Sequence, residues 1–197
     1  ADPFVAALDT KTGEVRWKTP RNSPAKKQFS FSTPLAISLN GATQIISAGS
    51  GFVGAYDPAN GNELWRWWAV PGDPSKGFEQ PELAMAAETW KGEWWKSGGG
   101  GTPWEGITYD PETDLVIFGT GNGAPWPAEV RSPGGGDNLF TASIVAVEAK
   151  TGRYRWHYQA TPMDSWDYDN AQSLVTADLV FNGVKKHVII QPSKNGF

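Results

Sequence analysis

A turn motif that occurs three times constrains the fold of this sequence more than any other feature. Residues 7–17, 55–65 and 146–156 each begin with Ala, with Gly six residues later and Trp ten residues later. In each copy an apolar run ends at an acidic residue that can bond turn amides, and the Gly supplies the positive φ of a chain reversal. The motif predicts a hairpin at intervals of roughly 40–50 residues, the period of a β-propeller blade. Its small Ala and large Trp are spaced so that the Trp of one unit can lie against the next unit.

The glycine and tryptophan content favours the same fold class. The 197 residues include 23 Gly and 11 Trp, and short strands joined by glycine turns with one large aromatic per unit are typical of propellers. Residues 108–114 form a degenerate copy that lacks both the Gly and the Trp. We therefore expect an all-β chain of four-stranded antiparallel blades, about four across residues 1–197. A Trp-rich β-sandwich is the alternative.

Two segments interrupt the repeat. Residues 79–95 contain helix-favouring residues without strand alternation, which predicts a short helical excursion. Four consecutive glycines at 98–101 follow it, and a second long loop rich in Pro and Gly spans residues 121–136. Because long loops in a compact domain usually carry function, these segments are candidates for the site.

Composition excludes several classes of function. A net charge of −4 favours neither nucleic acid nor an anionic membrane, and no apolar run is long enough for a transmembrane helix. With no Cys, the chain forms no disulfide, thiolate zinc site or c-type haem attachment. His157 and His187 are two isolated histidines without metal-ligand spacing. Residues 1–3 read like a mature or trimmed N-terminus, so we expect no signal peptide at the start of this sequence.

Several long motifs between residues 90 and 197 resemble the pyrroloquinoline-quinone (PQQ) dependent alcohol dehydrogenases, especially the quinohaemoprotein branch. The resemblance implies an eight-bladed propeller in the periplasm with PQQ and a metal ion at its centre. About half of that ring is expected here, so the chain is either a fragment or is completed by a second copy or a partner chain. The motifs are residues 93–96, 98–104, 119–126, 132–138, 166–169 and 194–197.

The resemblance also implies residues that bind the quinone. Trp104 is similar to the tryptophan that forms the floor under the planar cofactor, a role suited to an indole face. Thr102 matches a position whose polar atoms contact the cofactor. Lys194 resembles the cation that binds the quinone oxygens and stabilises the charge that develops there.

Three residues match the family's metal site and catalytic base. Asn122 is similar to the amide ligand of the metal, and Asp167 to the catalytic carboxylate that also binds the ion. Asp169 resembles the additional Asp of the lanthanide-dependent members, at a position where many calcium enzymes carry a small or neutral residue. A trivalent hard cation prefers another anionic oxygen, so a lanthanide is favoured over Ca²⁺. At a strand end, an Asp-x-Asp pair would project both carboxylates to the same side.

Each of these residues also has a purely structural interpretation. Trp104 could belong to the core, and Asn122 between glycines is typical of a turn. Asp167 and Asp169 could be solvated loop charges, and Lys194 alone carries little information. The joint order and spacing of the motifs favour the functional interpretation.

The sequence departs from the family pattern in its first third. The family's metal site includes a Glu shortly before the strand that leads into the Ala-x-Asp turn, near Ile46 here. Residues 15–56 contain no Asp or Glu, so a hard cation would lose a charged ligand. The family's disulfide between neighbouring cysteines is missing too, and residues 29–65 resemble non-catalytic PQQ-like propeller repeats.

Two functions follow from the resemblance and its departures. The first is oxidation of a small alcohol by hydride transfer to PQQ, with Ca²⁺ or a lanthanide as the metal and electrons passed to a separate cytochrome c. The second is a propeller scaffold or binding module that keeps the motifs without the chemistry. The missing Glu and the half-length ring favour the second function.

Overall fold

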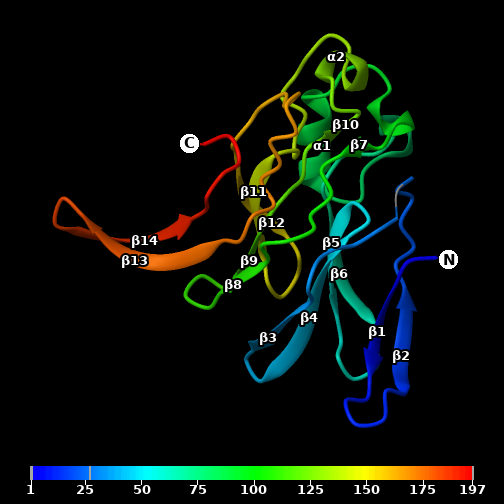
Figure 1. Cartoon of the computed structure of the whole chain (residues 1–197), viewed down its shortest axis with the longest axis vertical. Coiled ribbons are helices and arrows are strands. Elements are labelled where there is room, and N and C mark those ends of the chain that lie inside the picture. The colour runs from blue at the N-terminus through cyan, green and yellow to red at the C-terminus, as the bar shows by residue number, and fades with distance from the viewer. Residues whose placement is uncertain (1, 27, 197) are drawn as a thin grey trace.

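The computed structural model describes residues 2–26 and 28–196, and most of them lie in or between antiparallel sheets (Figure 1). Ala1 and Phe197, which belong to the terminal segments named above, lie outside the described residues. The sheets follow one another along the chain, and two of them have four strands. The fold class predicted from the repeat, a propeller built from four-stranded antiparallel blades, is confirmed.

Strand pairing follows sequence order within each of the four successive sheets. The first sheet has two strands and the second has four. The third also has four, the last has two, and a short ribbon of two strands lies apart from them. In order, the sheets are β1 (Phe4–Leu8) and β2 (Val15–Pro20); β3 (Leu35–Leu39), β4 (Ala42–Gly49), β5 (Phe52–Tyr56) and β6 (Glu63–Trp68); β8 (Thr108–Asp110), β9 (Leu115–Gly119), β11 (Ser143–Glu148) and β12 (Tyr154–Gln159); β13 (Val175–Phe181) and β14 (Val184–Ile190); with β7 (Gly99–Gly100) and β10 (Gly123–Ala124) as the ribbon.

The repeated turn motif joins the first sheet to the second and the second sheet to the third. The indole Nε1 of Trp65, in the second sheet, donates to the carbonyl of Ala149 at 2.9 Å, in the turn of the third sheet. The Trp65 ring also covers Gly152, where a methyl group would lie 2.6 Å from a ring carbon. Trp17 packs in the same way on Gly61 of the second sheet and donates to a carbonyl of that turn. The motif therefore contains both halves of the contact between sheets, as its spacing predicts.

The main core lies between the second and third sheets. Trp67 of β6 is fully buried and has its ring centroid 5.2 Å from that of Phe118 and 5.4 Å from that of Phe140. Burying one such side chain contributes about 2–3 kcal/mol, so the contact between the sheets is predominantly apolar. Other buried members of this cluster include Ile46, Val53, Ala55, Val116, Val145 and Val147.

The degenerate motif copy does not mark a blade of its own. Residues 108–114 comprise β8 and the turn that leads into β9, in the same sheet as the third regular copy. Asp114 adopts the positive φ (+54°) that Gly has in the regular copies, which explains why the copy lacks a glycine. The fourth unit is instead formed by β13 and β14.

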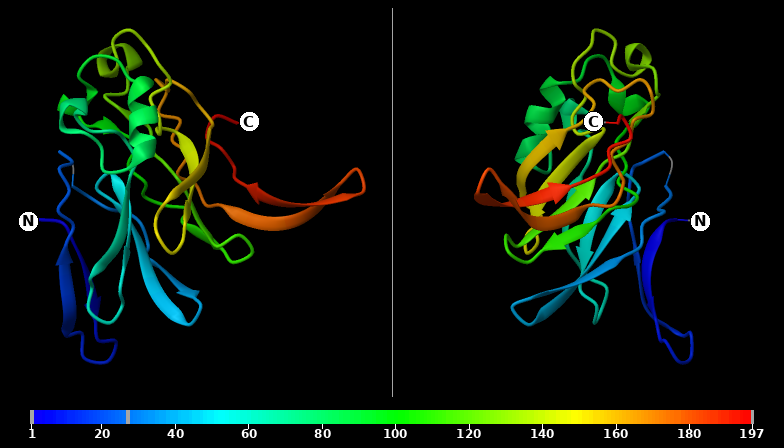
Figure 2. Two further views of the ribbon diagram at one scale, coloured as in Figure 1. Left: turned by 180° about the vertical axis from the view of Figure 1, so that it is seen from behind. Right: turned by 60° about the vertical axis from the view of Figure 1, so that its left-hand side comes forward.

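The predicted helical excursion is confirmed, and the helices gather with the long connections at one end of the sheets (Figures 1 and 2). Within the described ranges, the longest helix has eight residues, and no helix is long and apolar enough to cross a membrane. The helices are η1 (Pro74–Lys76), α1 (Pro81–Glu88), η2 (Trp94–Lys96) and α2 (Ala128–Arg131).

Candidate functional site

Four connections that are distant in sequence lie side by side at the end of the sheets that carries the helices. The carbonyl of Thr102 accepts from the amide of Gly121 at 3.2 Å, and the carbonyl of Thr120 accepts from the amide of Asn170 at 2.9 Å. The carbonyl of Asn170 in turn accepts from the side-chain amide of Gln191 at 2.8 Å. These bonds attach the segments that contain the predicted site residues to one another.

Trp104 and Asn122 lie on adjoining strips of backbone. The indole of Trp104 covers Gly121, where a methyl group would lie 2.4 Å from the ring carbon Cζ3, so only glycine admits the ring. Asn122 follows directly, and its side-chain nitrogen Nδ2 donates to the backbone carbonyl of Gly123 at 3.0 Å. This bond leaves the side-chain oxygen of Asn122 as the atom available to bind a cation.

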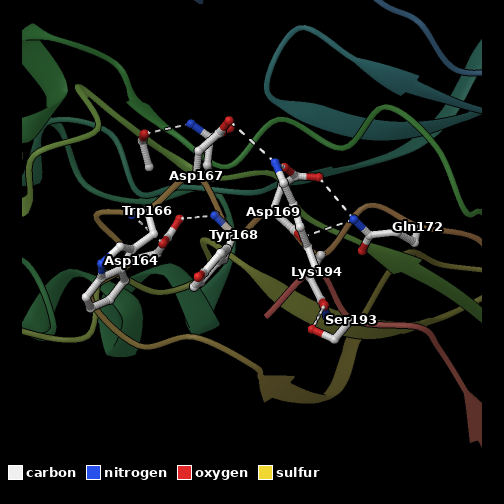
Figure 3. Close-up of polar contacts among 11 residues, drawn as sticks. Asp164, Trp166, Asp167, Tyr168, Asp169, Gln172, Ser193 and Lys194 are labelled. Atoms are coloured by element: carbon white, nitrogen blue, oxygen red, sulfur yellow. Dashed lines mark hydrogen bonds and ion pairs between the residues drawn. The ribbon is translucent and has the colours of Figure 1, made fainter. Parts of the chain in front are cut away.

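Lys194 joins the two predicted aspartates (Figure 3). Its Nζ lies 2.7 Å from Oδ1 of Asp169 and 3.4 Å from Oδ2 of Asp167. The Asp169 side chain is only 12% exposed, whereas that of Asp167 is 35% exposed. The hydrogen bond from Lys194 to Asp169 raises the pKa of the lysine above its ordinary value. The less buried carboxylate, Asp167, is therefore the one more accessible to a small molecule.

The two aspartates do not lie at a strand end, as the sequence analysis assumed, but in the irregular loop that precedes β13. Asp164, only 1% exposed, accepts the amides of Trp166 at 2.9 Å and Tyr168 at 3.0 Å with its two carboxylate oxygens. Asp167 between them has a φ of +65°. Sequence reasoning missed Asp164, whose signal was an Asp placed to cap the amides of the residues that follow it.

The segment expected to carry the family's Glu consists of strand β4 and the tight turn that follows it. β4 and β5 are joined by Ser50 and Gly51 alone, with φ values of +56° and +87°. Ile46, which stands near the expected Glu position, is fully buried in the main core. The described residues therefore place no carboxylate there, in agreement with the sequence.

The predicted residues form two groups that share a backbone scaffold. Direct side-chain contacts join Lys194 to Asp167 and Asp169, while Trp104 and Asn122 adjoin at Gly121. The two aspartates and the Asn122 amide supply hard oxygen atoms, which suit Ca²⁺ or a lanthanide. A half-buried indole such as that of Trp104 suits a planar quinone, and the Lys194 ammonium group suits the quinone oxygens. The residues present thus fit both a hard cation and PQQ, with fewer charged metal ligands than the family pattern.

His187 is not isolated in the fold, although it is in sequence. Its Nε2 lies 3.1 Å from Oδ2 of Asp110, and its Nδ1 lies 2.8 Å from Oδ1 of Asp178 and 3.5 Å from Oε2 of Glu112. The hydrogen bond with Asp178 raises the pKa of His187 above its ordinary value. This cluster joins the third sheet to β13 and β14, away from the residues predicted for the site.

The chain is similar to solved and curated proteins of one kind. It is 47% identical over 202 residues to the quinohemoprotein alcohol dehydrogenase ADH IIB of Pseudomonas putida, covering 100% of this chain and 29% of that protein. The structure matches that of the quinohemoprotein alcohol dehydrogenase from Comamonas testosteroni with a TM-score of 0.89 and 42% identity, over 99% of this chain and 30% of the other.

A more distant solved structure is that of a europium-containing methanol dehydrogenase. Its TM-score is 0.79 at 34% identity, over 100% of this chain and 36% of the other. The chain thus spans under a third of the length of the curated relatives named here. The profile of the PQQ family described as "Glucose/ethanol/alcohol dehydrogenase, beta-propeller domain" matches residues 35–197. This chain therefore belongs to the β-propeller family of the PQQ-linked glucose, ethanol and alcohol dehydrogenases.

Proposed function

We propose that this protein takes part in the oxidation of an alcohol by PQQ. The observation that carries the proposal is the contact of Lys194 with both Asp167 and Asp169, on a loop bonded to the segments that carry Trp104 and Asn122. A base, a cation and a stacking surface are the groups that such an oxidation needs from a protein. The named relatives that cover this chain are alcohol dehydrogenases.

Each residue has a chemical role in this proposal. Trp104 would form the floor under the quinone, and Thr102 would supply a polar contact to it. PQQ, when bound, supplies an electrophilic quinone carbonyl that accepts a hydride. Asp167 takes the hydroxyl proton of the alcohol, and Lys194 balances negative charge at the quinone oxygens.

Asn122, Asp167 and Asp169 are the proposed metal ligands. Two carboxylates and an amide are a short set for Ca²⁺, which takes six to eight oxygen ligands, so further ligands come from outside these three residues. The second carboxylate, Asp169, favours a lanthanide over Ca²⁺. The ion would act as a Lewis acid toward the quinone.

The electron acceptor and the compartment follow from the resemblance. A cytochrome c is the proposed electron acceptor. One relative, 37% identical over 198 residues, is a lupanine 17-hydroxylase whose name includes cytochrome c. The periplasm is the proposed compartment, which cell fractionation would test.

A scaffold without catalysis is the second candidate function. The buried Ile46 of β4, near the position expected for the family's Glu, favours this alternative because an expected charged metal ligand is missing there. To distinguish the two, the purified protein is incubated with PQQ and either Ca²⁺ or La³⁺, and ethanol-dependent dye reduction is followed. Dye reduction with either ion supports the enzyme. Absence of PQQ binding with both ions would point to the scaffold.

A further inference from the structure

We infer that Arg131 and Asp164 are positioning residues that fix the catalytic Asp167 relative to Asn122. The inference rests on the proposed function for the roles of Asp167 and Asn122. The physical link between the two loops stands on contacts of its own. No role was predicted from the sequence for either Arg131 or Asp164, although Arg131 lies in the candidate loop of residues 121–136.

Arg131 is a buried charge whose contacts are mostly with backbone. It ends α2 and is only 1% exposed. A guanidinium removed from water needs hydrogen bonds to its N–H groups, and burial lowers the pKa of Arg131. Its acceptors are three backbone carbonyls and one side-chain amide: Pro125 at 2.7 Å, Trp126 at 2.8 Å, Asp164 at 2.8 Å and Oδ1 of Asn138 at 3.0 Å.

One face of the guanidinium supports the strand that follows Asn122. A methyl group at Gly123 would lie 2.3 Å from Cζ of Arg131, so the backbone of Gly123 rests directly on the guanidinium. Gly123 pairs with Gly100 in the β7–β10 ribbon, and Gly100 stands two residues before Thr102. Arg131 therefore fixes the position of the backbone next to Asn122, the proposed amide ligand.

The same guanidinium holds the loop of the catalytic base. Arg131 donates to the backbone carbonyl of Asp164. The carboxylate of the same Asp164 accepts the backbone amides on both sides of Asp167 (Figure 3). These two bonds hold Asp167 at a φ of +65°, which an L-residue adopts only at a cost. Arg131 and Asp164 thus form a continuous chain of contacts from Gly123 to the backbone of Asp167.

Hydrogen exchange tests the link without any cofactor. The variant R131K keeps the charge but not the planar fork of donors, and R155K is the control because Arg155 makes an exposed ion pair with Glu148. In R131K we expect the Trp166 and Tyr168 amides to exchange about ten-fold faster than in the wild type. Unchanged exchange at both amides in folded R131K would overturn the inference.

Asp164→Asn is the second variant, in case R131K does not fold. An asparagine retains one acceptor oxygen, so one of the two loop amides loses its bond. We expect faster exchange at the Trp166 or Tyr168 amide, with exchange in the β4–β5 hairpin unchanged. Exchange like that of the wild type at both loop amides would contradict the role of Asp164.

Terbium binding tests the consequence for the site. Tb³⁺ luminescence, excited through tryptophan, reports binding of the trivalent ion alone to the purified protein. If Arg131 positions the ligands, R131K and Asp164→Asn should bind Tb³⁺ about 10- to 100-fold more weakly, as is usual when the support of a metal ligand is removed. A merely stabilising role would lower the melting temperature and leave the affinity of the folded protein unchanged. Failure of the wild type to bind Tb³⁺ would count against the proposed metal site, while the exchange measurement still decides the positioning role.

Discussion

The ammonium group of Lys194 lies 2.7 Å from the carboxylate of Asp169. These two residues are 25 positions apart and flank the β13–β14 hairpin. The hairpin therefore brings the loop before β13, which carries Asp169, next to the segment after β14, which carries Lys194. With Asp167 also in reach of Lys194, the three side chains carry a net charge of −1. A site with surplus negative charge can accept a metal cation even while the lysine remains protonated.

Replacing Asp169 with Ala should change the preference for the metal ion. The variant loses an anionic oxygen, which matters more to La³⁺ than to Ca²⁺, so we expect La³⁺-supported dye reduction to fall about 10- to 100-fold and Ca²⁺-supported reduction to fall less. Asp137→Ala is the control, because Asp137 is exposed and belongs to a different loop. Equal losses with the two ions would show that Asp169 does not discriminate between them.

Replacing Trp104 with Ala should weaken PQQ binding. The variant loses both the stacking surface and its apolar area, and we expect the dissociation constant to rise about 10- to 100-fold. The affinity is measured by quenching of tryptophan fluorescence, with Trp126→Ala as the control because Trp126 is 58% exposed. Equal affinity for PQQ in the Trp104 and Trp126 variants would remove Trp104 from the cofactor site.

Gly152 and Gly13 occupy the same position of the turn motif but should tolerate alanine differently. Both have positive φ, +69° and +74°, so alanine costs about 1–2 kcal/mol of unfolding free energy at either position. At Gly152 the methyl group would also lie 2.6 Å from the Trp65 ring, whereas at Gly13 no atom lies within 4 Å. Overpacking adds about 1–3 kcal/mol, so G152A should be clearly the less stable variant in urea. Equal losses would mean that Trp65 does not rest on this turn in solution.

His187 and His157 should make the folding stability of the protein depend on pH in opposite directions. Asp178 raises the pKa of His187, so its stabilising contribution is full below the unfolded pKa of about 6.5 and is lost as pH rises through the folded pKa. Burial lowers the pKa of His157, so its neutral form is favoured and stability is lost as pH falls below about 6.5 toward the folded pKa.

Glutamine at each position separates the two contributions. H187Q should remove part of the loss of stability above pH about 6.5, and H157Q should remove part of the loss below it. Melting temperatures between pH about 5.5 and about 8.5 measure both effects, and each variant serves as the control for the other. Identical pH profiles for the wild type and H187Q would mean that the carboxylates of Asp110, Glu112 and Asp178 do not act on His187.

The repeat could be read from the sequence because its physical cause is local. Ala, Gly and Trp at fixed spacing create a turn and the tryptophan that covers the next turn, so Trp65 and Gly152 could be identified without coordinates. The degenerate copy misled for the same reason. Asp114 imitates the backbone of the motif's glycine while it serves a different hairpin.

The supporting residues of the site could not be read in this way. Arg131 bonds mainly to backbone carbonyls, which leave no pattern of residue types, and the amide-capping position of Asp164 does not distinguish it from other loop aspartates. His187 lies 77 positions from Asp110, so nothing local indicates that the two side chains meet. Trp104, Asn122 and Lys194 were proposed from the family resemblance, and the fold alone would not assign their roles.

The contact between sheets has a direction, because the second sheet receives Trp17 of the first sheet on its turn and contributes Trp65 to the turn of the third. Such a head-to-tail joint does not depend on which particular sheet stands on either side. Units with the same turn are therefore interchangeable as building blocks, and gene duplication can lengthen or renew the series without inventing a new interface. Chemistry can then evolve in the connections at the opposite end, where Asn122 and Asp167 lie, without loosening the joints.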